Sequence, residues 1–440
     1  MTTAREGRLG ALLGLRPHAR PPARGRAVHG PVWLGLSSLV TGAATYLLLI
    51  LLARVIGAIG YADFAVFWSF LVIVSFGVFL PVEQDVARRV AGEPGSVPTV
   101  LRGAVVVAMG YAAALVVVAG ILWVTLLRTR PEPAMVVALV LLCLAEASQF
   151  CARGVLSGQV RLPAYATVVG SDAVLRLATV AGLALLGVRS PGAFALAVAL
   201  SAAVAAALGW ALLLRRTAAT SVLTSRARPD RPRTRLLRST GGLIVGALGM
   251  QLLLNGGTLV ARGLASQSEA ALAGHLLATM TLARVPVFLL QSMQASYLAR
   301  VARQARERDH VSLLRTLRLL GGLALALAVA TPLGAFLVGP ELIRVVYGES
   351  FVISREAGVL VALGVGCYVI GSVSNDVAVA LGRHGTVAGA WLVAVTLGVA
   401  TTLLAGTLVE KSTLPLVVGA TVAAALLVTR IAADTRRIGA

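Results

Sequence analysis

The stretch PVWLGLSSLVTGAATYLLLILLA, residues 31–53, contains 23 residues and no Asp, Glu, Lys or Arg. An α-helix crosses a bilayer core about 30 Å thick with roughly 20 apolar residues. The stretch is therefore long enough to span a membrane, and it exceeds the apolar region of about 7 to 15 residues that a cleaved signal peptide carries. We expect it to remain in the protein as a membrane anchor, although an arginine-rich segment precedes it.

Eleven further apolar segments follow this span. Seven of them contain no charged residue, namely 64–82, 103–127, 191–214, 239–261, 319–340, 385–409 and 412–429. Four more, near 134–151, 163–188, 270–299 and 357–381, carry one or two ionisable residues each. With 58% hydrophobic residues, 13% charged residues and a mean hydropathy of +0.88, the composition excludes a water-soluble globule. The sequence predicts an all-α, polytopic membrane protein with 12 transmembrane helices.

The net charge of +21 is distributed unevenly along the chain. If residues 1–30 are cytoplasmic, segments on their side of the membrane hold 29 of the 39 basic residues, and the loops on the other side hold eight. Lys and Arg accumulate in cytoplasmic loops, and an even number of spans puts both termini on one side. The sequence predicts a multi-pass protein of the cell membrane with cytoplasmic termini. The charge then reports orientation and not a nucleic-acid partner.

An arginine-rich connection separates the first six spans from the last six. Residues 215–240 hold eight Arg, one Asp and two Pro, which predicts a cytoplasmic linker. Its charge fits either anionic membrane lipids as partners or a plain topology signal and tether. The predicted organisation is a cytoplasmic tail (1–30), an N-lobe of spans one to six (31–214), the linker (215–240), a C-lobe of spans seven to twelve (241–431) and a cytoplasmic tail (432–440).

Short sequence matches relate the two lobes. LLAR ends the first span at Arg54, and LVAR ends the seventh at Arg262. The pair Ala87-Arg88 follows the second span, as Ala299-Arg300 follows the eighth. Because spans one and seven start on the same side, the lobes are predicted to be related by a pseudo-two-fold axis along the membrane normal.

Signals for catalysis or cofactors are scarce. Cys143, Cys151 and Cys367 lie in apolar runs without metal-ligand spacing, so we expect no metal site. Lys411, the only Lys, lacks the preceding Gly of a phosphate-binding loop. The outer loops are short, the longest being 339–356, and leave little room for catalytic acids. We expect neither a cofactor nor enzyme activity.

Two stretches resemble one transporter family. Residues 52–90, LARVIGAIGYADFAVFWSFLVIVSFGVFLPVEQDVARRV, are similar to the opening of the polysaccharide flippase family, within the larger group that includes multidrug and toxic-compound extrusion transporters and lipid II flippases. Residues 284–303, RVPVFLLQSMQASYLARVAR, are similar to that family's eighth span. The resemblance implies translocation of a polyprenyl-pyrophosphate-linked oligosaccharide or related glycolipid, with glycan-assembly proteins as partners. The alternative is small-molecule efflux. The first span contains no acidic residue that could bind a coupling cation, which argues against this alternative.

Five ionisable residues fall within predicted spans: Glu146, Asp172, Arg176, Arg284 and Asp376. Burying an ion in a bilayer costs about 2.5 kcal/mol or more, so such residues face a partner, a cavity or the bundle interior. Asp172 and Arg176 share a helical face at i, i+4, and a hairpin of spans four and five brings Glu146 to the same depth. The three form either a structural polar cluster or a site for coupling or cargo.

Arg284 is the sharpest candidate for binding an anionic head group. No ionisable residue lies three or four positions from it, and Pro286 predicts a distorted backbone. A guanidinium suits a phosphate or pyrophosphate group; the alternative is a carboxylate or carbonyl partner from another helix. Arg176 is the second candidate. Polar side chains nearby in the sequence are candidates for binding sugar hydroxyls or for joining helices: Gln251, Asn255, Gln291 and Gln294.

Two further groups lie near the predicted span ends. Glu83, Asp85, Arg88 and Arg89 are expected to form a solvated cluster at the inner end of the second span, either as a gate or as an ordinary charged helix end. His275 is expected to be a packed or interfacial residue near the outer end of the eighth span.

Overall fold

The computed structural model describes residues 29–92, 97–126, 132–217 and 233–439. Within these ranges the chain is all-helical and forms no strand. Eleven of these helices are long and apolar enough to cross a membrane, and one of them, Trp33–Gly92, is 60 residues long. A straight helix of that length measures about 90 Å, roughly three bilayer cores. This segment is therefore too long for a single span, and it contains the two predicted apolar runs 31–53 and 64–82, apart from the first two residues of the former.

Gly57 divides the two spans. Helix α3 (His29–Val74) is helical on both sides of Gly57, whose φ of 69° and ψ of 180° are not. Glycine adopts a positive φ because it has no Cβ. Tyr46 and Tyr61, about 22 Å apart in a straight helix, both contact Thr281, which shows that the chain doubles back between them. The structure thus contains the twelve predicted spans.

The N-lobe continues from the second half of α3 through six further segments. They are η1 (Ser75–Phe79), α4 (Leu80–Gly92), α5 (Val97–Leu126), α6 (Pro133–Gly158), α7 (Leu162–Leu185) and α8 (Pro191–Thr217). η1 is one turn of π-helix. Pro81 is the second residue after it, and proline lacks the N–H that an α-helix needs for its i to i−4 bond. The wider turn is the local response to that missing donor.

The C-lobe is built from seven helices. They are α9 (Arg233–Leu264), α10 (Ala270–Ala283), α11 (Val285–Glu307), α12 (His310–Tyr347), α13 (Arg355–Ala380), α14 (His384–Leu404) and α15 (Leu408–Gly439). Trp391 of α14 is fully buried in its core, with its ring centroid 5.9 Å from that of Tyr368. A Cβ added at Gly249 of α9 would lie 3.0 Å from Trp391 Cβ, so this glycine lets α9 approach the backbone of α14 closely at Trp391.

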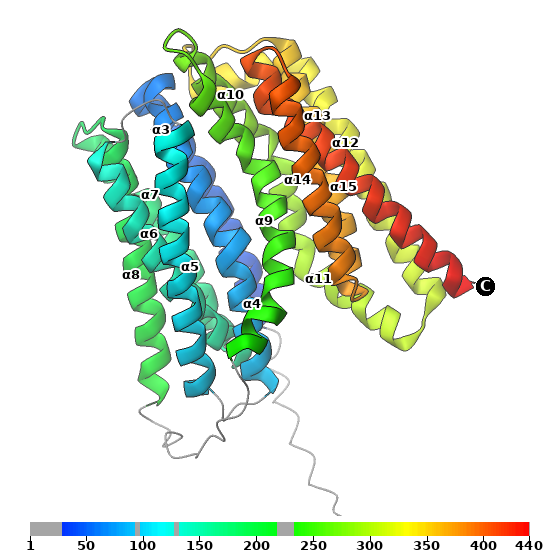
Figure 1. Cartoon of the computed structure of the whole chain (residues 1–440). Helices are drawn as coiled ribbons and strands as arrows, with labels where there is room; N and C mark the ends of the chain where they lie inside the picture. Colours follow the sequence, from blue (N-terminus) through cyan, green and yellow to red (C-terminus); the bar gives the residue numbers. More distant parts are fainter. Residues whose placement is uncertain (1–28, 93–96, 127–131, 218–232, 440) are drawn as a thin grey trace, which may run out of the picture.

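The helices of both lobes run between the same two ends of the molecule (Figure 1). We call the end at which α8 finishes and α9 begins the linker end, and the opposite one the far end. α3 of the N-lobe packs against α9 and α10 of the C-lobe. The N-lobe core extends at the far end into Ala261, Leu276 and Ile343 of the C-lobe. Toward the linker end, α12 and α15 lean away from α5 and α8 (Figure 1).

Some helix bounds differ from the predicted domain limits. α8 ends at Thr217 and α9 begins at Arg233, so both enter the predicted linker of residues 215–240. Most of that linker, residues 218–232, lies outside the described residues, and so do residues 1–28 of the predicted tail at 1–30. α15 continues to Gly439, through most of the predicted tail at 432–440. A helix does not need to end where the hydrocarbon ends, so α8, α9 and α15 continue past the apolar runs from which the spans were predicted.

Candidate functional site

The predicted cluster of Glu146, Asp172 and Arg176 is assembled in the N-lobe. Arg176 Nη2 lies 2.7 Å from Glu146 Oε1 and 2.8 Å from Asp172 Oδ2, and its Nε donates to Asp172 Oδ1 at 2.8 Å. Glu146, on α6, is 2% exposed, and Arg176, on α7, is 9% exposed. The guanidinium thus bridges two carboxylates and leaves the cluster with one net negative charge.

A second buried ion pair, which the sequence did not predict, involves Arg153 of α6, seven residues after Glu146. Arg153 Nε is 3.0 Å from Glu83 Oε2, and the Tyr165 hydroxyl connects the two residues at 3.0 Å and 2.8 Å. The guanidinium also lies 4.2 Å from the centroid of the Phe150 ring. Arg153 follows Glu146 by seven residues, two helical turns, so the same face of α6 carries both. The seven-residue spacing of Glu146 and Arg153 is the sequence pattern from which this second buried charge on α6 could have been predicted.

Gln149 lies between these two clusters on α6. Its side chain is completely buried, and neither Nε2 nor Oε1 has a hydrogen-bond partner among the described residues. A buried amide without partners is unusual and destabilising.

The expectation of a solvated cluster on α4 is wrong for both carboxylates. Glu83 is 5% exposed and Asp85 is 2% exposed. α4 packs tightly on α6, because a Cβ added at Gly154 would lie only 2.8 Å from Val86 Cβ. Asp85 is paired with Arg88 and, at 2.7 Å, with Arg89 Nε. These contacts of Glu83, Asp85, Arg88 and Arg89 stay within the N-lobe, so the role of a gate remains a prediction.

Arg284 lies where the eighth span breaks. α10 ends at Ala283 and α11 begins at Val285, with Pro286 in its first turn, as the sequence predicted. Arg284 Nη1 donates to Asn255 Oδ1 at 3.0 Å and Nη2 to the Leu254 carbonyl at 2.5 Å, both on α9. The predicted alternative, a carbonyl partner from another helix, is therefore present. No described carboxylate lies within 4 Å of this guanidinium, and its Nε is buried without a hydrogen-bond partner.

The N-lobe reaches the same helix break. The Tyr46 hydroxyl lies 3.3 Å from the Thr281 carbonyl oxygen, and the Tyr61 hydroxyl lies 3.4 Å from Thr281 Oγ1. Thr281 precedes Arg284 by three residues, so Arg284 lies close to the contact between the lobes. Tyr46 also packs edge-on against Phe288 of α11, with 5.3 Å between ring centroids.

The polar residues predicted beside Arg284 divide into two groups. Asn255 contacts Arg284 directly, and Gln251 Oε1 accepts from Asn255 Nδ2 at 3.0 Å. Gln291 is exposed on α11. Gln294 donates instead to Asp376 Oδ1 at 2.9 Å.

Asp376 is the centre of a separate network in the C-lobe. Besides Gln294, the Tyr297 hydroxyl donates to it, and Asn375 Nδ2 lies 3.2 Å from Oδ1. Trp391 Nε1 in turn donates to Asn375 Oδ1 at 3.0 Å. No described Arg or Lys lies within 4 Å of Asp376.

His275, at the far end, packs against the Phe351 ring with 5.5 Å between centroids, as expected of a packed residue.

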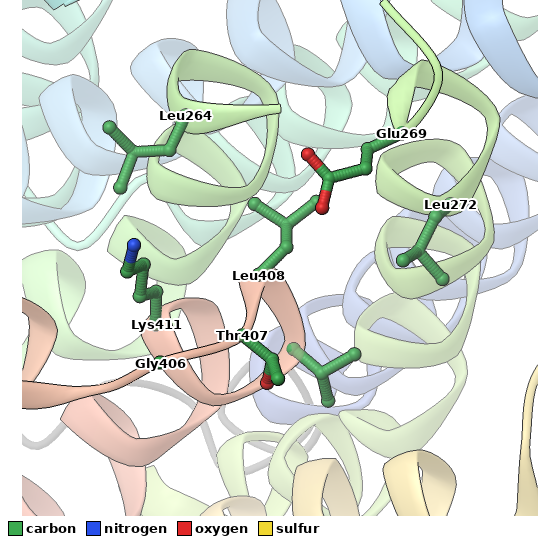
Figure 2. A pocket seen from close by; sticks show the side chains of 8 residues that line it. Leu264, Glu269, Leu272, Gly406, Thr407, Leu408 and Lys411 are labelled. Atoms are coloured by element: carbon green, nitrogen blue, oxygen red, sulfur yellow. The ribbon is translucent and has the colours of Figure 1, made fainter. Parts of the chain in front are cut away.

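A cavity of about 230 Å³ lies at the far end of the C-lobe, and Arg284 is not among the residues that line it; Figure 2 shows its lining side chains. Leu264, Glu269 and Leu272 line it from the start of α10 and the end of α9, and Gly406–Lys411 closes it from the start of α15. This cavity is smaller than the roughly 300 to 1,000 Å³ of ordinary ligand pockets, and it is too small for an oligosaccharide. It is not the predicted cargo site.

A family model described as a polysaccharide biosynthesis protein matches residues 27–303. Uncharacterized proteins of Mycobacterium tuberculosis and Mycobacterium bovis are 27% identical over 332 residues, which is 72% of this chain and 72% of theirs.

Solved structures with a similar fold include MATE transporters. An inward-facing multidrug resistance MATE transporter of the MOP superfamily matches with a TM-score of 0.68 and 14% identity, over 91% of this chain and 99% of that one. A Vibrio cholerae MATE transporter gives 0.60 and 16%, over 92% and 95%. A eukaryotic MATE transporter gives 0.63 and 15%, over 94% and 98%. At these identities the likeness shows the two-lobe fold.

Proposed function

Because this chain belongs to the polysaccharide biosynthesis protein family, we propose that it is a flippase for a polyprenyl-pyrophosphate-linked oligosaccharide or related glycolipid. It moves this lipid from the cytoplasmic to the outer leaflet of the cell membrane for cell-surface polysaccharide biosynthesis. The polar head group crosses between the lobes while the polyprenyl tail stays in the hydrocarbon. The family and the fold are those of transporters.

The observation that carries this proposal is the uncompensated charge of Arg284. Its partners, an amide oxygen and a backbone carbonyl, are neutral. A full positive charge therefore stays inside the membrane region, close to the contact between the lobes, where an isolated ion is costly. A pyrophosphate group supplies the missing negative charge and accepts two N–H donors of one guanidinium. Arg176 is a weaker candidate because Glu146 and Asp172 already neutralise it.

Transport does not require ATP in this proposal. A membrane potential that is negative inside drives an anionic head group outward by roughly 2.3 kcal/mol per charge per 100 mV. Glu146 and Asp172 are the proposed carriers if a cation is also coupled, because their cluster retains one negative charge.

Reconstitution tests the proposal directly. Vesicles with the purified protein receive a fluorescent polyprenyl-pyrophosphate glycan, and a membrane-impermeant reductant then reports the fraction of probe in the outer leaflet. We expect the protein to equilibrate the probe between leaflets and Arg284→Gln to slow this at least tenfold, the loss expected for a charge-assisted contact. Arg344→Gln, an exposed arginine at the far end, is the matched control. A probe that stays in one leaflet with the wild-type protein refutes the function.

The second candidate function is small-molecule efflux. The multidrug MATE transporters that share this fold favour it. Deleting the gene separates the two functions in cells: a flippase deletion reduces surface polysaccharide without changing drug tolerance, whereas an efflux deletion does the reverse.

A further inference from the structure

The hairpin of α11 and α12 carries a dense set of positive charges at the linker end. Six exposed arginines fall within 19 residues of its sequence. Three follow one another at i, i+3 and i+6 along α11, one forms the turn, and two lie on the first turns of α12. We call this surface the arginine hairpin; its members are Arg300, Arg303, Arg306, Arg308, Arg315 and Arg318.

These arginines are not neutralised by the protein. In the described part of the chain, none of the six has a carboxylate within 4 Å, whereas Arg153, Arg176 and Arg262 each face one within 3.0 Å. The hairpin itself contains two acidic residues. One of them, Asp309, caps α12 by accepting from the Ser312 amide at 3.1 Å. These hydrogen bonds from Ser312 lower the pKa of Asp309, so it is a helix cap and not an arginine partner.

The arginine hairpin lies where apolar surface meets water. Val301 and Leu313 are buried, whereas Val311 is 82% exposed and Leu319 is 67% exposed. Leu319 directly follows Arg318 and starts the long apolar part of α12. Arginines at such a boundary extend toward the head-group region while their stems stay on apolar surface. In Figure 1 the hairpin projects sideways from the bundle at the linker end.

We propose that the arginine hairpin binds the head groups of anionic phospholipids in the leaflet at the linker end. Phosphate oxygens accept from guanidinium groups, and several arginines at one membrane surface attract anionic lipid additively. The exposed valine and leucine beside them favour a lipid surface over a soluble polyanion. This inference does not depend on the identity of the cargo.

Brominated lipids test the proposal locally. Val311→Trp places a fluorophore on the hairpin, and the same protein without that substitution supplies the background of the native tryptophans. We expect brominated phosphatidylglycerol to quench the added signal more than brominated phosphatidylcholine at equal mole fraction in neutral vesicles. Each arginine removed lowers the lipid preference by roughly fivefold, so Arg300→Gln with Arg303→Gln and Arg306→Gln largely abolishes it. High salt weakens it as well.

Two controls keep the test decisive. Arg344→Gln with Arg355→Gln removes positive charge at the far end and leaves the preference intact. Arg315→Gln with Arg318→Gln changes the other helix and reproduces the loss should the triple variant fold poorly. Equal quenching by both lipids, or a preference that survives in both hairpin variants, overturns the proposal.

Discussion

At the scale of single residues, several buried ionisable side chains are paired with opposite charges, whereas Arg284 and Asp376 have no ion-pair partner among the described residues. Arg176 bridges Glu146 and Asp172, and Arg153 is paired with Glu83. The i, i+4 spacing within α7 made the first cluster predictable, because helical geometry fixes such neighbours. Two partners of Asp376, Tyr297 and Gln294, are 79 and 82 residues away in sequence. Only the packing of α11 on α13 brings them together, so no local pattern indicated them.

Arg176→Met tests whether the N-lobe cluster is required for folding. It leaves two carboxylates, both shielded from water, without their cation, and breaking a buried pair costs about 3 to 5 kcal/mol. We expect a clearly lower Tm of the purified protein. Adding Glu146→Gln removes one unpaired charge and restores part of the loss. A double variant no more stable than Arg176→Met would contradict the electrostatic explanation.

Gln149→Leu tests whether the buried amide of Gln149 lowers the stability of the protein and whether transport needs it. It replaces two buried polar atoms that have no partners by apolar atoms of similar volume, and removing unsatisfied polar groups gains about 1 to 3 kcal/mol. We expect Tm to rise. A transport rate that stays at the wild-type level marks Gln149 as dispensable, and a fall in Tm contradicts the packing described for α6.

At the scale of elements, apolar length predicted the spans well and their turns poorly. Runs of about 20 apolar residues locate spans because the bilayer sets their length. The reversal at Gly57 and the π-turn before Pro81 left no comparable signal. Each depends on one residue's backbone freedom or missing donor, and tertiary contacts decide which glycine or proline is used that way.

Arg54 fastens α3 to the end of α12 at the far end of the molecule. Its Nε and Nη2 donate to the carbonyls of Val346 and Val345 at 2.9 Å and 2.5 Å. Arg54→Ala removes these inter-lobe bonds, of about 1 kcal/mol each. We expect a roughly fivefold or greater shift toward a state opened at that end.

Labelling measures this shift. Thr281→Cys places a thiol at the lobe contact, and its reaction with a membrane-impermeant maleimide becomes faster when Arg54→Ala is added. Arg189→Ala, which removes a 2.7 Å bond to the Val55 carbonyl inside the N-lobe, is the matched control. An unchanged labelling rate would show that Arg54 does not hold the lobes together.

At the scale of the whole molecule, the one lysine gives a direct test of orientation. Lys411 lines the far-end cavity (Figure 2), where α15 begins, opposite the linker end (Figure 1). With cytoplasmic termini the far end faces outward, so we expect a membrane-impermeant amine reagent to label intact cells at Lys411. Lys411→Arg keeps the charge and abolishes the signal. Labelling only after lysis would invert the predicted topology, which rests on the arginine distribution alone.

The break at Arg284 also makes the eighth span a mechanical joint. The upper segment, α10, is held to the N-lobe by Tyr46 and Tyr61 through Thr281. The lower segment, α11, is held to α13 by the hydrogen bond that the Tyr297 hydroxyl donates to Asp376. We therefore expect a rotation of one lobe against the other to change the angle between α10 and α11, and to move the guanidinium of Arg284 that lies between these two helices.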